Sequence, residues 1–106
     1  MRSTLVQFLI PVVDQEGARI AEAQFESMRS ALTERFGGVT AFVHSPALGT
    51  WKGASDANVQ QDEVILVEVI VDQLDRSWWS NYRSQLEELF NQDEILMRAL
   101  EIERLL

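Results

Sequence analysis

The run DEVILVEVIVD, residues 62–72, decides the fold of this chain. It is the most β-branched run in the sequence, and β-branched side chains favour the pleated surface of a strand. Between its acidic ends only Glu68 is polar, so both faces of the strand are apolar. A strand with two apolar faces is typical of the middle of a sheet. We therefore expect residues 62–72 to form a central strand with neighbours on both sides.

Three further segments predict strands. Residues 4–12, TLVQFLIPV, alternate between two faces, and Pro11 stands near the end, where a missing ladder donor does least harm. Residues 39–46 predict a second strand, and residues 94–102, EILMRALEI, predict a fourth. For the last segment a helical tail is an alternative interpretation.

Between these strands the hydrophobic period changes to three and four residues, which is the period of one helix face. Two apolar stripes with this period predict helices over residues 20–36 and 74–90. The first ends at Gly37, because glycine adopts the left-handed conformation of a helix C-terminus without steric cost. Asp75 is placed to cap the start of the second helix, and Asn91 to stop it.

The expected order is therefore β-α-β-β-α-β within a single domain, residues 1–106. A weak internal repeat supports this order. The first helix ends with Leu32 four residues before Phe36, and the second ends with Leu86 four residues before Phe90. Two βαβ units with right-handed crossovers give a four-stranded antiparallel sheet with both helices on one face. The predicted class is α+β.

The pattern FGGVTA at residues 36–41, followed by GTW at residues 49–51, is similar to small bacterial proteins of unassigned function with ferredoxin-like folds. The layout of the whole chain resembles the dimeric α/β-barrel superfamily. This resemblance implies a ferredoxin-like βαββαβ domain, two copies of which pack their open sheet faces together. It also implies an enclosed space that some members of the superfamily use for small molecules or haem. A fold with so many functions assigns none of them.

The net charge of −8 comes from the second half of the chain. Residues 1–53 carry five basic and five acidic side chains, whereas residues 54–106 carry four basic and twelve acidic ones. The basic residues are scattered, and the sequence shows no basic stripe. An acidic surface is typical of a soluble protein and repels phosphate backbones, so we expect no nucleic-acid partner. A basic protein is an alternative partner.

The chain contains no cysteine, which excludes disulfides, thiolate metal sites and cysteine nucleophiles. Its apolar start, residues 5–13, is broken by Gln7 and Pro11 and lacks a small-residue cleavage site. We interpret it as a strand rather than a signal peptide. No run approaches the roughly 18 apolar residues that predict a membrane span. We expect a cytoplasmic protein with no membrane partner.

The sheet face away from the helices is predicted to be largely apolar. Two helices cover only one side of a four-stranded sheet, so the other side meets water or another molecule. A monomer rarely exposes an apolar patch larger than a few hundred Å². We therefore expect a homodimer, or a higher assembly, that forms through this face. Alternation places eight apolar side chains there: Leu5, Leu9, Phe42, Val64, Leu66, Ile70, Leu96 and Leu100.

The same face carries one polar side chain from each predicted strand. In the strand order 4-1-3-2 these side chains form a row across the sheet: Arg98, Gln7, Glu68 and His44. Three interpretations remain open for the row. It is a polar network that fixes the register of two subunits, a site for a small polar ligand, or a catalytic site.

His44 is the only histidine, and without cysteine a zinc site there would need carboxylates or a second subunit. We expect no metal and no cofactor; haem ligation by His44 follows only from the superfamily resemblance. Trp51 lies in a long loop, residues 45–61, where it caps a ligand, inserts into a partner or packs over the sheet edge. Of the pair Trp78-Trp79, we expect Trp79 in the core and Trp78 at its rim.

Two functions from different classes remain. The favoured one is a non-enzymatic homo-oligomer that binds a small molecule or a protein. The alternative is a small barrel enzyme, similar to a monooxygenase or an isomerase, that uses the polar row without a metal. An RNA-recognition module is rejected, because FGGVTAFV at residues 36–43 lies on the wrong strand and lacks the basic residues of that motif.

Overall fold

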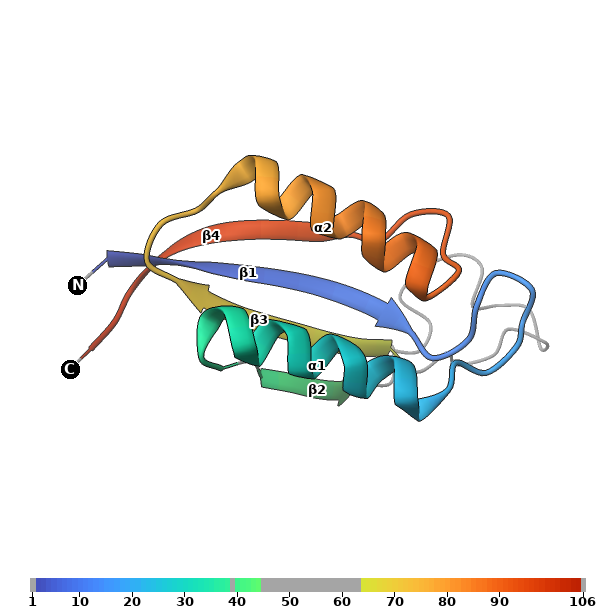
Figure 1. Ribbon diagram of the computed structural model, residues 1–106. Coiled ribbons are helices and arrows are strands. Elements are labelled where there is room, and N and C mark those ends of the chain that lie inside the picture. The colour runs from blue at the N-terminus through green and yellow to red at the C-terminus, as the bar shows by residue number, and fades with distance from the viewer. Residues whose placement is uncertain (1, 39, 45–63, 106) are drawn as a thin grey trace, which may run out of the picture.

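The computed structural model describes residues 2–38, 40–44 and 64–105, and for residues 41–44 it describes the backbone alone. The described part contains two helices and four strands (Figure 1). The predicted α+β class is confirmed. In chain order the elements are β1 (Arg2–Pro11), α1 (Glu22–Phe36), β2 (Thr40–His44), β3 (Val64–Val71), α2 (Arg76–Leu89) and β4 (Met97–Glu103).

The strands form one antiparallel sheet in the order β2-β3-β1-β4. β3 pairs with β1 over its whole length, from Thr4 opposite Val71 to Pro11 opposite Val64. On its other side β3 pairs with the short strand β2. The run that is apolar on both faces is therefore flanked by a strand on each side, as the sequence predicts.

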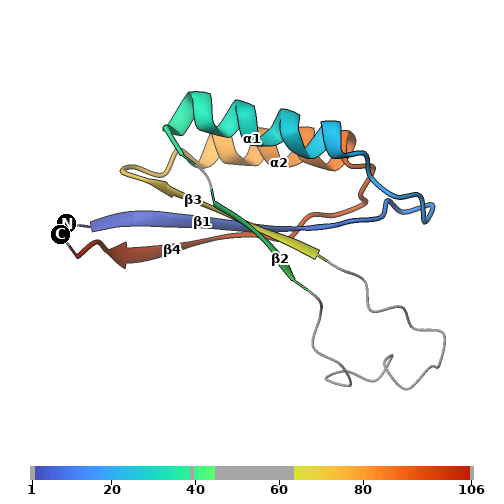
Figure 2. The same ribbon diagram turned by 90° about the horizontal axis from the view of Figure 1, so that it is seen from below.

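Both helices lie on one side of the sheet (Figure 2). Their ends follow from local chemistry. Gly37 ends α1 with a φ of 81°, and its N–H donates to the carbonyl of Thr33 at 2.8 Å. Asp75 caps α2, because its carboxylate accepts a hydrogen bond from the Trp78 N–H at 3.0 Å. Asn91 adopts a φ of 48° just beyond α2, in the left-handed region expected of a stop.

The core lies between the helices and the sheet. Every second residue of β1 and β3 enters it, and the buried faces of both helices meet them there. Trp79 is buried in the core and Trp78 is half-buried at its rim, as expected. The largest fully buried side chains are Phe8, Phe90, Ile10, Met28, Leu32, Leu86, Ile95, Val6, Val67 and Val69.

The C-terminal segment is a strand, and the alternative of a helical tail is wrong. Met97–Glu103 pairs with β1 in a continuous register, from Phe8 opposite Met97 to Arg2 opposite Glu103. The strand begins later than the predicted residue 94. Ile95, before the strand, is already buried, and its N–H donates to the Glu87 carboxylate at 3.0 Å. Neither described helix is long and apolar enough to cross a membrane.

Tyr82 offers a test of the packing of α2. It is the only tyrosine, and its ring stacks on Trp78 with a centroid distance of 4.9 Å. Burial raises the pKa of its phenol from the ordinary 10.0 to about 12. As the pH rises, the phenol therefore loses its proton in the unfolded chain before it does so in the folded protein. The phenol's contribution to the free energy of unfolding is fully present below pH 10 and is lost as the pH rises to 12.

We predict that the tyrosinate absorbance of the folded protein rises with a midpoint well above pH 10. In concentrated urea, where the chain is unfolded, the midpoint should lie near pH 10. In Tyr82→Phe the fall in stability over this pH range should be reduced. A folded-state midpoint at pH 10 would show that the ring is not packed as described.

Candidate functional site

The open face of the sheet is organised in three rows that run across the strands. Leu5, Gln7 and Leu9 of β1 and the even-numbered residues of β3 and β4 point away from the helices, because their neighbours fill the core. An upper apolar row aligns Leu9 with Leu66, and Leu9 N–H donates to the carbonyl of Leu96. A lower apolar row aligns Leu5 with Ile70 and Leu100.

The middle row is polar and continuous. Gln7 lies opposite Glu68 on one side and opposite Arg98 on the other. Arg98 Nε donates to Gln7 Oε1 at 2.8 Å, and Gln7 Nε2 donates to Glu68 Oε2 at 2.6 Å. The neutral amide of Gln7 thus connects a guanidinium to a carboxylate two strands away.

The fourth predicted member of the row, His44, does not belong to it. Glu68 lies opposite Thr40 in β2, whereas His44 lies opposite Val64, four residues further along β2. Thr40 and His44 share a sheet face, because they are an even number of residues apart, and only the register distinguishes them. The row is therefore Arg98, Gln7, Glu68 and Thr40. The side chains of Phe42 and His44, and all of Trp51, lie outside the described residues.

A recess of about 420 Å³ opens beside Glu68. It lies where β2 begins, so Ile70 has no partner in that strand. Gly37 and Gly38 line it, and an added Cβ at either would meet nothing within 4 Å. The other lining residues are Leu5, Phe36, Thr40, Glu68 and Ile70.

The recess combines a carboxylate with an apolar wall. Glu68 uses one carboxylate oxygen for Gln7, and the other makes no hydrogen bond to the described residues. That oxygen can accept a hydrogen bond from an amine, amide or hydroxyl group, while Leu5 and Ile70 contact the apolar part of the same molecule. Among the described residues, no group of three or more His, Asp or Glu side chains is placed to hold a metal ion.

Sequence reasoning missed Thr40 and the glycine pair as parts of this site. Gly37 ends α1, as the sequence predicts, and together with Gly38 it also lines the recess. The length of β2 is the signal that could have indicated these residues, because a strand shorter than its neighbour leaves one end of that neighbour unpaired and so leaves room for a recess.

Comparison with known proteins gives no relative for this chain. No protein-family model matches it, and neither a curated protein nor a solved structure does. The function must therefore be argued from the residues of the site.

A double-mutant cycle tests the polar row. Gln7→Leu and Arg98→Met each remove one side of the same hydrogen bond. A hydrogen bond to a charged group contributes about 1.5–3 kcal/mol, and because this one is exposed we expect the lower end of that range in free energy of unfolding. We predict a coupling energy of that order from urea unfolding of the two single variants and the double variant at one protein concentration.

Gln85→Leu is the matched control, because Gln85 is exposed on α2. Paired with Arg98→Met it should show no coupling. Equal, negligible coupling in both cycles would contradict the hydrogen-bonded row.

Proposed function

We propose that the protein is a homodimeric binding protein with a ferredoxin-like fold, in which two copies pack their open sheet faces together as in dimeric α/β barrels. The observation that carries this proposal is the exposure of large apolar side chains on the open face. Ile70 is 49% exposed, Leu96 56% and Leu100 44%. All three flank the polar row, so they form one surface rather than isolated exposed residues.

The charges of the middle row favour a second copy as the occupant of this face. From β4 to β3 the row reads positive, neutral, negative: Arg98, Gln7, Glu68. A two-fold axis that runs along β1, between two stacked sheets, places Gln7 opposite Gln7. The same axis places Arg98 of each copy opposite Glu68 of the other. The row is therefore complementary to itself, as a two-fold interface requires.

The lengths of the charged side chains and the positions of the apolar rows are compatible with two stacked sheets. Stacked sheets lie about 10 Å apart, a distance that an arginine and a glutamate side chain can span together. The axis that aligns the polar rows also stacks each apolar row on its own copy, with Leu100 opposite Ile70. Each large apolar side chain that becomes fully buried contributes about 1.5–3 kcal/mol.

The recess beside Glu68 is the proposed ligand site of this dimer. A second sheet stacked on the open face would cover it and exclude water. The ligand class is a small molecule that donates a hydrogen bond to Glu68 and places an apolar group against Leu5 and Ile70. Binding rather than catalysis is proposed, because Gln7 already holds the guanidinium and the carboxylate of the row in one chain of hydrogen bonds.

Analytical ultracentrifugation tests the assembly. We predict a dimer at tens of micromolar for the unchanged protein and a monomer for Leu100→Asp. The new carboxylate is solvated in a monomer, because Leu100 is exposed there, but it loses water in the interface at a cost of several kcal/mol.

Leu105→Asp is the control, since Leu105 lies beyond the end of β4 and is 87% exposed. It should remain a dimer. A monomeric unchanged protein, or equal dissociation of both variants, would refute the proposed interface.

A further inference from the structure

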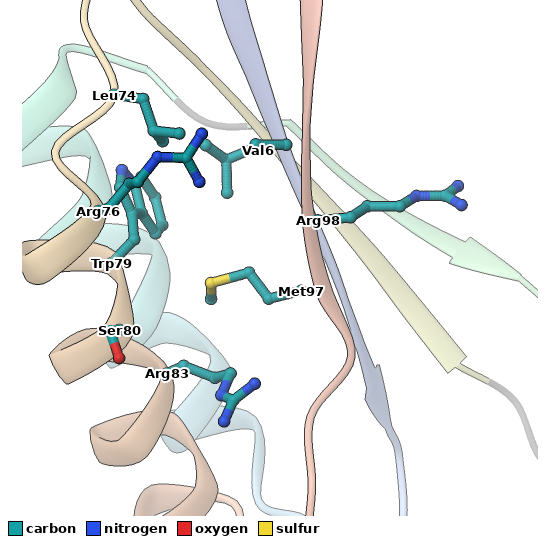
Figure 3. A pocket seen from close by; sticks show the side chains of 9 residues that line it. Val6, Leu74, Arg76, Trp79, Ser80, Arg83, Met97 and Arg98 are labelled. Carbon is teal, nitrogen blue, oxygen red and sulfur yellow. The ribbon is translucent and has the colours of Figure 1, made fainter.

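A second hollow lies on the helix side of the sheet, between α2 and the edge strand β4 (Figure 3). Its volume is about 260 Å³. α2 contributes residues at positions i, i+3, i+4 and i+7, which form one helix face. We call this hollow the α2–β4 groove. Its lining residues are Val6, Leu74, Arg76, Trp79, Ser80, Arg83, Met97, Arg98 and Ala99.

Small side chains leave the groove open. Ser80 on α2 and Ala99 on β4 line it with few atoms, whereas Trp79 and Met97 form its apolar floor. Met97 points from β4 toward α2, between the two arginines of the helix (Figure 3). The groove is therefore an apolar slot with a guanidinium near each end.

The charge of the groove is opposite to that of the protein. Of the four basic residues in positions 54–106, three line it, and none of the carboxylates in the described part of the chain does. Arg98 turns its guanidinium away to the open face, as Figure 3 shows, where it binds Gln7. Arg76 and Arg83 remain directed at the groove (Figure 3).

The two arginines are not equally available. Arg83 Nε lies 3.7 Å from Glu87 Oε2, an oxygen that also accepts a hydrogen bond from the Ile95 N–H. Arg76 makes no ion pair with any of the described residues. A guanidinium beside an apolar slot, with no ion pair to another described residue, is suited to a carboxylate that carries an apolar group.

We propose that the α2–β4 groove binds small amphipathic carboxylates. The carboxylate accepts hydrogen bonds from Arg76, with Arg83 as a second positive charge, and the apolar chain lies against Trp79 and Met97. The groove opens on the side of the sheet opposite to the proposed dimer interface. Its occupation therefore does not depend on the dimer, and either proposal can fail alone.

An NMR titration with sodium hexanoate tests the proposal. Amide and side-chain signals of ¹⁵N-labelled protein report where the ligand binds. We expect saturable shifts at the Arg76 Nε–H, the Trp79 indole N–H and the amides of Met97 and Ala99. Hexanamide has the same chain without the charge, and it should bind at least tenfold more weakly.

Two variants test the contacts. Arg76→Gln should weaken hexanoate binding about tenfold or more, and Ala99→Leu should abolish it by filling the groove. Arg19→Gln removes the same charge from an exposed position in the connection between β1 and α1, and it should leave the affinity unchanged. A thermal melt of each variant checks that the fold is retained.

Three results would each overturn the proposal. The first is equal binding of hexanoate and hexanamide. The second is a set of shifts confined to the open face, around Ile70 and Leu100. The third is an unchanged affinity in Arg76→Gln, and this variant decides the question even if Ala99→Leu does not fold.

Discussion

The coverage of only one sheet face by the two helices is the constraint on which the rest of this structure depends. Val6, Val67 and the other core residues are buried because α1 and α2 lie on their side of the sheet. Each buried strand residue has neighbours in sequence that point the other way, and on β1, β3 and β4 many of these are leucine or isoleucine. The same alternation that builds the core therefore builds a second apolar surface with no helix of the described chain on it.

The polar row favours one orientation of a second copy on this apolar surface. A purely apolar face could pack in many registers, whereas a row that is positive at one edge and negative near the middle favours one arrangement of two copies. Removing water from Arg98 and Glu68 costs free energy unless each meets an opposite charge. Gln7 connects them through hydrogen bonds within one copy. In the proposed dimer the Arg98 nitrogens that Gln7 does not use also lie opposite Glu68 of the other copy. In the proposed dimer the polar row supplies the specificity, while the apolar rows supply most of the affinity.

The strands, the helix ends and the two sheet faces could be predicted from the sequence, since each depends on a local period or on one capping residue. Gln7, Glu68 and Arg98 were correctly placed in one row. His44 was not, because alternation fixes the face of a residue but not its offset along the neighbouring strand, and Thr40 satisfies the same alternation. The α2–β4 groove escaped prediction because Arg76 and Arg83 look scattered until α2 aligns them beside Ala99, on a strand far along the chain.

Isotope-filtered NOE spectroscopy can show whether a second copy covers the open face about an axis along β1. The sample is an equal mixture of ¹³C-labelled and unlabelled protein, in which filtered signals arise only between copies. We predict contacts from the Leu100 methyl groups of one copy to the Ile70 methyl groups of the other, and between the two Gln7 side chains. Contacts between copies that are confined to α1 and α2, with none from the open face, would contradict this arrangement.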